Sequence, residues 1–259
     1  MVPRYIGVTG FMGGAQVHTT YQGSVLSVNH SSPPLLMVGV LANVETLMGE
    51  KRNKRFPSSS TIRTIFPEGK RFLNLVHYSS VTEDPEDLYR EILKIRQYGG
   101  VRCHGLQLNL QKLPERGVFM AYCHQYPFDT VILQANDGVL AQSGYDPNKF
   151  ASAIASYVHD HPKTGVVLNW SRGKGSAHLD IEEKCVYIDA LMSAHVGNVT
   201  VAGGLCAKNA HLLEQLLQEF PCVSVDAGGE LYGEDERTRL STERAIQWVD
   251  AMTRLYHRR

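Results

Sequence analysis

Two stretches near the end of the chain, VTVAGGLCAKNA (199–210) and CVSVDAGGEL (222–231), decide the expected fold. Each begins with a short β-branched apolar run and stops at small residues, as a buried strand that ends in a tight turn does. Between them, apolar residues recur at helical spacing, namely Leu212, Leu213, Leu216, Leu217 and Phe220. This order of strand, helix and strand predicts a parallel βαβ unit.

Both turns carry glycine pairs, Gly203-Gly204 in the first and Gly228-Gly229 in the second. Glycine turns leave backbone N–H groups free, and beside a helix N-terminus such groups can hold a phosphate. We therefore expect the N–H groups of these four glycines to bind a phosphorylated small molecule. The alternative is that the glycines only permit tight turns.

Six further apolar segments of strand length precede this pair. The eight expected strands are 5–9, 36–41, 72–77, 105–109, 130–134, 165–169, 199–202 and 223–226. Most are apolar at nearly every position, which is typical of parallel strands buried on both faces. The 259 residues match one (β/α)8 barrel, which usually needs about 250. We predict a single barrel domain over residues 1–259, with the glycine turns after its last two strands, where this fold holds phosphate.

Capping residues mark several helix starts, two of them with proline at the first helical position. These starts are Asp84-Pro85, Asp146-Pro147, Asp180 with Glu183, and Ser241, and Gly99-Gly100 is a stop signal. Residues 11–34 carry a poor helix signal. The basic segment 51–60 is expected to be a long loop after the second strand.

The composition excludes several classes of protein. With 26 basic and 26 acidic residues, the chain has no overall charge to favour nucleic acid or an anionic membrane. Its apolar runs are of strand length, short of the ~20 residues that span a bilayer. Because the first residues already predict a strand, we expect no signal sequence. Five scattered cysteines without CxxC spacing indicate reduced thiols, so we expect a cytoplasmic protein.

Several motifs resemble those of phosphoribosylanthranilate isomerase, a (β/α)8 barrel enzyme of tryptophan biosynthesis. AGGLCAKN (202–209) is similar to that family's seventh-strand phosphate turn, AGGLxPxN, and VDAGGE (225–230) to its eighth-strand turn, VDxSSGxE. VVLNWSRGKGSAHLD (166–180) resembles the sixth strand and its glycine-rich loop, GLQLN (105–109) resembles VQLHG, and GVTG (7–10) resembles KICG. KRFPSS (54–59) is similar to SPRYVS, which implies that Arg55 is a substrate-binding arginine.

The resemblance stops at the catalytic pair. It implies an Amadori rearrangement, in which a carboxylic acid opens the ribose and the cysteine of KICG removes a proton. Here the cysteine position holds Thr9, and the aspartate at the sixth strand end is Asn169. An amide cannot act as an acid, and a hydroxyl without an adjacent base cannot replace a thiolate near neutral pH. We therefore expect the scaffold and phosphate site of the family without its acid–base pair.

Polar residues end most strands, where this fold carries its active site. They are Thr9, Asn43, His77, Asn109, Gln134, Asn136, Asn169, Arg172 and Asp226. The many amides favour hydrogen bonds to hydroxyls or a nucleobase edge. Because His77 and Asp226 titrate usefully, we expect them to be catalytic, with a histidine pKa near 6 to 7 in the pH–rate profile. The alternatives are a structural histidine and an aspartate facing the barrel wall.

The expected substrate-binding residues are Thr9, Arg55, Asn109, Asn169 and Arg172. Arg172 and Lys174 lie between glycines and suit a second anionic group, unless they belong to an ordinary surface loop. The chain shows no cofactor motif. It also shows no convincing metal site, because His159-Asp160-His161 is more typical of a solvated helix end. The sixth strand ends without the lysine that a Schiff-base aldolase needs.

Three functions stay open. The first is an enzyme that converts a phosphorylated sugar or nucleotide-like molecule by acid–base chemistry, as an isomerase, a lyase or an enzyme of N-glycosidic cleavage. The second is a genuine phosphoribosylanthranilate isomerase with relocated catalytic groups, and the third is a barrel that binds a phosphorylated ligand without catalysis. The expected partner is this small molecule, with no nucleic acid and no membrane; a homo-oligomer is left open.

Overall fold

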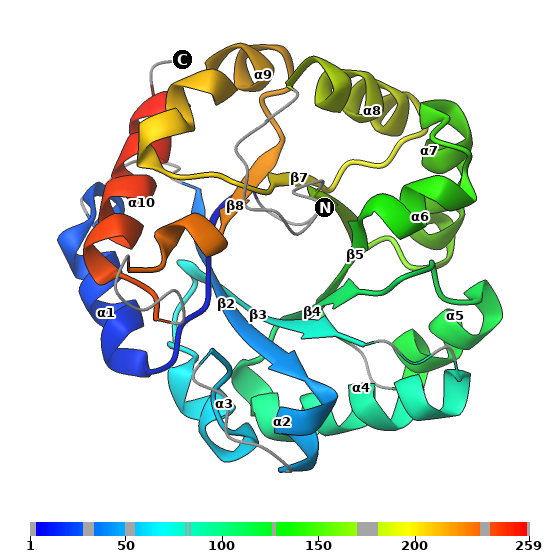
Figure 1. Ribbon diagram of the computed structural model, residues 1–259, viewed down its shortest axis with the longest axis horizontal. Helices are drawn as coiled ribbons and strands as arrows, with labels where there is room; N and C mark the ends of the chain where they lie inside the picture. The colour runs from blue at the N-terminus through cyan, green and yellow to red at the C-terminus, as the bar shows by residue number, and fades with distance from the viewer. Residues whose placement is uncertain are drawn as a thin grey trace.

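The eight strands form one closed parallel barrel in chain order, with β1 beside β8 (Figure 1). The computed structural model describes residues 4–27, 34–49, 55–80, 82, 84–125, 128–169, 181–233 and 239–257. The strands are β1 (Tyr5–Thr9), β2 (Leu35–Asn43), β3 (Phe72–Ser79), β4 (Gly105–Asn109), β5 (Thr130–Ala135), β6 (Thr164–Asn169), β7 (Val199–Ala202) and β8 (Ser224–Ala227). The predicted barrel and all eight predicted strands are confirmed, with β2 and β3 running further at their C-terminal ends.

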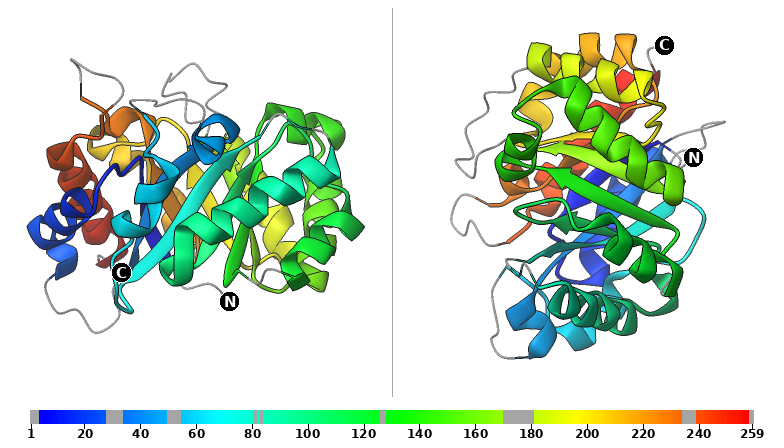
Figure 2. Two further views of the ribbon diagram at one scale, coloured as in Figure 1. Left: turned by 90° about the horizontal axis from the view of Figure 1, so that it is seen from below. Right: turned by 90° about the vertical axis from the view of Figure 1, so that its right-hand side faces the viewer.

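Helices surround the strands on the outside, as both views in Figure 2 show. The α-helices are α1 (Gly14–Gly23), α2 (Val44–Met48), α3 (Ser59–Ile65), α4 (Pro85–Gly99), α5 (Arg116–Gln125), α6 (Asp137–Gln142), α7 (Pro147–Asp160), α8 (Ile181–Ser193), α9 (Glu214–Glu219) and α10 (Thr242–His257). Four short 3-10 helices are η1 (Val25–Ser27), η2 (Gly100–Arg102), η3 (Ala207–Leu213) and η4 (Gly229–Leu231). The helices α1 and α10, from opposite ends of the sequence, lie side by side (Figure 1).

The capping signals set the helix starts as predicted. Asp84 accepts a hydrogen bond from the Glu86 N–H at the start of α4, and Asp146 accepts two at the start of α7. The α4 helix stops at Gly99, followed by Gly100 with φ of 64°, and α10 begins directly after Ser241. The expected cap Asp180 lies outside the described residues.

Two expectations about the helices and loops need correction. The apolar residues from Leu212 to Phe220 lie on or directly after two short helices, η3 and α9, and not on one longer helix. The Asn209 side chain accepts from the Cys206 N–H and donates to the Gly204 carbonyl, which tightens the chain into η3 before α9. Of the expected loop 51–60, residues 51–54 lie outside the described residues, and its end is corrected because α3 already begins at Ser59. Residues 11–34, with their poor helix signal, contain the short α1 and η1.

Two separate apolar clusters build the core. The larger one packs the outer strand faces against the helices. The smaller one fills the inside of the barrel with side chains that alternate along the strands, namely Tyr5, Met37, Leu73, Leu75, Ile132, Val167 and Ala202. These inner side chains fill the barrel from its N-terminal end to its middle. The C-terminal strand ends are therefore left to line an open mouth.

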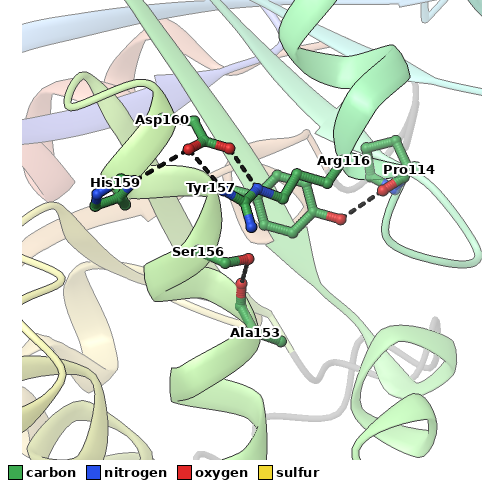
Figure 3. Close-up of polar contacts among 7 residues, drawn as sticks. All are labelled: Pro114, Arg116, Ala153, Ser156, Tyr157, His159 and Asp160. Carbon is green, nitrogen blue, oxygen red and sulfur yellow. Dashed lines mark hydrogen bonds and ion pairs between the residues drawn. The ribbon is translucent and has the colours of Figure 1, made fainter.

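Polar contacts on the outer wall join α5 to α7 (Figure 3). The Arg116 guanidinium holds the Asp160 carboxylate with two donors, and His159 contacts the same carboxylate at 3.1 Å. The expected helix-end histidine therefore lies beside a surface ion pair, away from the barrel mouth. Within the described ranges, no three histidine, cysteine or acidic side chains gather as a metal site would require. Nor does any described helix combine the length and apolarity needed to cross a membrane.

Candidate active site

A cavity of about 450 Å³ opens at the C-terminal ends of the strands. This volume is in the usual range for a small-molecule site. The structure brings ten of the sequence-predicted site residues to its wall: Thr9, Arg55, His77, Asn109, Asn169, Gly203, Gly204, Asp226, Gly228 and Gly229. The eleventh, Arg172, lies outside the described residues.

Thr9 links the two titratable residues at the bottom of this cavity. Its hydroxyl donates to the Asp226 carboxylate at 3.0 Å and 3.1 Å, and lies 3.4 Å from His77 Nδ1. Because the Thr9 proton goes to Asp226, its oxygen is left to accept from a proton on His77 Nδ1. This arrangement leaves His77 Nε2 as an acceptor, and that buried nitrogen has no hydrogen-bond partner among the described residues.

Burial shifts the pKa values of Asp226 and His77 in opposite directions. It raises the pKa of Asp226 to about 7, an effect that the Thr9 hydrogen bond partly opposes. It lowers the pKa of His77 to about 3. At neutral pH His77 is therefore uncharged, whereas Asp226 exists in both forms. The sequence predicted that His77 titrates near neutral pH. In the structure, Asp226 is the residue of this pair with a pKa near neutrality.

Two glycines in the barrel wall make room for this trio. A β-carbon at Gly39 would lie 2.4 Å from Thr9 Oγ1 and 3.0 Å from His77 Nε2. A β-carbon at Gly7 would lie 2.5 Å from Asp226 Oδ1. These distances are too short for ordinary van der Waals contact. Thr9, His77 and Asp226 therefore fit here because Gly7 in β1 and Gly39 in β2 have no side chain.

Neutral amides from β4 and β5 form the opposite wall. Gln107 donates to Gln134 at 3.2 Å, and Asn109 donates to Ser79 at 3.2 Å. Gln107 Oε1 is buried without a hydrogen-bond partner among the described residues. Like His77 Nε2, it is a buried acceptor of a residue that lines the cavity.

Asn43 and Asn136 do not join this wall, contrary to the expectation for the strand ends. Asn43 caps α2 by accepting from the Thr46 N–H at 3.0 Å. Asn136 caps α6 and donates to Asn109 Oδ1 at 3.0 Å, so it supports a cavity residue from behind. Asn43 is the last residue of β2, and Asn136 directly follows the last residue of β5. At both positions the next helix begins, and one of its first N–H groups donates to the asparagine side chain.

The glycine turns stand on the β7–β8 side of the cavity. Gly203 and Gly204 have φ of 95° and 65°, the left-handed region that favours glycine. Within the described part of the chain, the N–H groups of Gly203, Gly204, Gly228 and Gly229 donate no hydrogen bond. All four glycines line the cavity.

Arg55 adds a cation at the rim. Its guanidinium carbon lies 5.4 Å from the centre of the Tyr232 ring. Burial raises the pKa of Tyr232, and the nearby Arg55 opposes that rise. An exposed guanidinium beside the glycine turns suits a negatively charged ligand.

Sequence reasoning missed several lining residues, including Gln107, Ser79 and Tyr232. Strand alternation carried a signal for two of them, because Gln107 is two residues before Asn109 and Ser79 is two residues after His77. Tyr232 follows η4 rather than a strand, and no pattern in the sequence points to it.

Comparison with known proteins supports the fold and goes no further. No family model matches the sequence, and no curated protein matches it. The carboxyl transferase domain of Rhizobium etli pyruvate carboxylase with pyruvate is 12% identical, with a TM-score of 0.56 over 98% of this chain and 48% of that one. Rhizobium etli pyruvate carboxylase with the allosteric activator acetyl coenzyme-A is 12% identical, with a TM-score of 0.55 over 98% of this chain and 25% of that one. The chain thus spans about half or less of these proteins, and at such identities the likeness shows only an eight-stranded barrel.

Proposed function

We propose that this protein is an enzyme that binds a phosphorylated sugar or nucleotide-like molecule of the phosphoribosyl type and converts it by acid–base chemistry, as an isomerase or a lyase. The observation that carries this proposal is the trio of Asp226, Thr9 and His77 at the bottom of a polar cavity. A carboxyl group with a pKa of about 7 can both take and return a proton near neutral pH.

Binding is assigned to the two walls of the cavity. The free N–H groups of the glycine turns, with Arg55 at the rim, provide donors and positive charge for a phosphate. The amides of Gln107, Asn109 and Gln134, with Asn169, provide hydrogen bonds to sugar hydroxyls or to a base edge. A ligand with an anionic end and a neutral polar end therefore matches both walls.

Catalysis is assigned to Asp226, with Thr9 and His77 as its neighbours. The ionised Asp226 accepts a proton from substrate carbon or oxygen, and the neutral form returns it. The Thr9 hydroxyl stabilises the ionised form by its hydrogen bond. The neutral His77 offers Nε2 to a substrate hydroxyl, which fixes the substrate against the carboxylate.

A second candidate is a genuine phosphoribosylanthranilate isomerase in which Asp226 replaces the missing acid. It is favoured because the turns that resemble the family, at Gly203 and at Gly228, both line the cavity. Complementation of a tryptophan auxotroph separates this candidate from the broader proposal.

The test uses the whole protein with ribose 5-phosphate and inorganic phosphate as probes. We expect both to shift the amide resonances of the four glycines, and we expect deuterium from D2O to enter the carbon-bound positions of ribose 5-phosphate. Mass spectrometry of metabolites that co-purify then identifies the natural ligand. Glycine shifts without deuterium incorporation or any other turnover would favour a barrel that binds without catalysis. No glycine shift would reject the phosphate site.

A further inference from the structure

A buried lysine lies directly behind the β7 glycine turn. Lys184 belongs to α8, its residue is 3% exposed, and its Nζ donates to the carbonyl oxygen of Ala202 at 2.9 Å. Ala202 is the last residue of β7 and is followed by Gly203. We propose that Lys184 is a positioning residue that strengthens the anion site at this turn, an inference that rests on the proposed function.

The effect passes through one peptide group. The carbonyl of Ala202 and the N–H of Gly203 belong to the same planar peptide unit. An ammonium that binds the carbonyl oxygen withdraws electron density from that unit, so the N–H becomes a stronger donor. Because the Gly203 N–H donates to no described residue, this stronger donor is available to an anion in the cavity.

Charge reinforces the same effect. Lys184 carries a positive charge on the protein side of the turn, and Arg55 carries one at the exposed rim of the cavity. An anion at the glycine turns would lie between them. The buried ammonium is screened less by salt than the exposed guanidinium.

Packing alone does not call for a lysine at this position. The neighbouring buried residues of α8 include Tyr187, Ile188 and Leu191. An apolar residue at position 184 would extend this face without the cost of removing an ammonium from water. The lysine therefore serves polar contacts, among them the hydrogen bond to the Ala202 carbonyl.

The test compares Lys184→Met, which removes the charge and the donor, with Lys184→Arg, which keeps both. Inorganic phosphate is titrated into each protein, and the Gly203 and Gly204 amide resonances are followed by NMR. We expect Lys184→Met to bind phosphate about tenfold more weakly, from the loss of one unit charge in a partly buried setting. We expect Lys184→Arg to stay within about threefold of wild type. Lys149→Met, the same change on the exposed side of α7, is the matched control and should have no effect.

A second readout needs no ligand. In free Lys184→Met the Gly203 amide proton should move upfield, because its peptide is less polarised, whereas a purely structural lysine would not move it selectively. Unchanged phosphate affinity or an unchanged Gly203 resonance in a folded Lys184→Met protein would overturn the inference. If that variant does not fold, Lys184→Gln, an uncharged donor, takes its place, and phosphate affinity equal to that of Lys184→Arg would overturn it. Absence of phosphate binding in the wild type would instead reject the proposed function itself.

Discussion

The two ends of the barrel interior treat polar groups in opposite ways. At the N-terminal end, the Tyr5 hydroxyl pairs with Thr200 Oγ1 at 2.7 Å, and Ser224 accepts from the Tyr5 N–H at 3.1 Å. The cavity there is only about 10 Å³. At the C-terminal end, His77 Nε2 and Gln107 Oε1 are buried without partners beside a cavity of about 450 Å³.

This difference separates an end whose polar groups are satisfied within the fold from an end that, in the proposed function, leaves two acceptors for a ligand. Each buried polar atom without a partner costs about 1 to 3 kcal/mol of stability. Such a cost is tolerated where a ligand supplies the missing hydrogen bonds. Changes at the lower end should therefore reduce stability, and changes at the mouth should reduce binding or turnover.

The largest effect is expected from Asp226→Asn, which keeps the shape of the side chain and removes its proton chemistry. A positioned acid or base contributes about 10²- to 10⁴-fold in rate. Turnover, measured as deuterium incorporation into ribose 5-phosphate, should fall at least 100-fold, while phosphate affinity stays within a few-fold. The wild-type pH–rate profile should show a limb near pH 7, from the raised pKa of Asp226.

Two further variants complete this comparison. His77→Gln should also cost about 100-fold in turnover, because the substrate loses the acceptor that orients it. Asn169→Ala should weaken substrate binding more than turnover. Full activity in both Asp226→Asn and His77→Gln would reject this mechanism and assign the proton transfer to other groups.

The next effect concerns the pH dependence of stability. Relative to their ordinary values of 3.8 and 6.5, burial raises the pKa of Asp226 to about 7 and lowers that of His77 to about 3. Near pH 5 the folded protein thus holds a proton on Asp226, and the unfolded chain holds one on His77 instead. These counts are equal, so the pair gives the wild type almost no slope.

Substituting either residue should reveal the pH dependence of stability that the other one contributes. Relative to wild type, the free energy of unfolding of Asp226→Asn should rise with pH by about 1.4 kcal/mol per unit between pH 4.5 and 6, because only His77 takes up a proton on unfolding. That of His77→Gln should fall by the same amount, because only Asp226 releases one. Urea unfolding at each pH measures both, with the double variant as a flat control. Slopes of the same sign would show that the assigned protonation states are wrong.

A steric change at the mouth should act on binding alone. Gly228→Val and Gly229→Val place a side chain at the β8 glycine turn, where neither residue has a positive φ and no atom lies within 3.4 Å of either built β-carbon. We expect each to weaken inorganic phosphate binding at least about tenfold, equivalent to 1.4 kcal/mol.

Gly204→Val should do the same, although its φ of 65° adds strain. Gly13→Val is the control outside the cavity, because its φ is −164° and its built β-carbon meets nothing within 4 Å. If Gly228→Val and Gly229→Val bind phosphate as the wild type does, the anion site lies elsewhere.

The smallest effect is expected at the N-terminal end of the barrel interior. Tyr5→Phe removes one buried hydrogen bond to Thr200 and should cost about 1 kcal/mol of unfolding free energy. Phosphate affinity should not change. Tyr145→Phe, at a residue that is 51% exposed, is the control and should leave stability unchanged. A loss of phosphate affinity in Tyr5→Phe would mean that the two ends are not independent.

The barrel could be predicted from the sequence because its signals are local. Apolar runs mark the strands, and residues such as Asp84 and Asp146 mark the helix starts with their own side chains. The short α2 and α3 were missed because each has too few residues to show a period. Strand ends also pointed to Thr9, His77 and Asp226, because a parallel barrel gathers those ends in one place.

The chemical state of the site could not be predicted in this way. The raised pKa of Asp226 and the lowered pKa of His77 result from burial, which depends on all eight strands together. The room for these side chains comes from Gly7 and Gly39, whose importance is visible only once the strands lie side by side. Gln107 was missed because it sits one inward position below the strand end.

The hydrogen bond between Thr9 and Asp226 crosses the seam where β1 meets β8, and its partners are 217 residues apart in sequence. The same seam is held by Trp248, whose indole donates to the Gly7 carbonyl across 241 residues. Contacts of such long range form slowly during folding, since most of the chain must be ordered first. In a partly folded chain with an open ring, Asp226 would still be a hydrated carboxylate with an ordinary affinity for protons. Ring closure is therefore the event that buries Asp226 and raises its pKa, and the buried Trp248 provides a fluorescent signal for it.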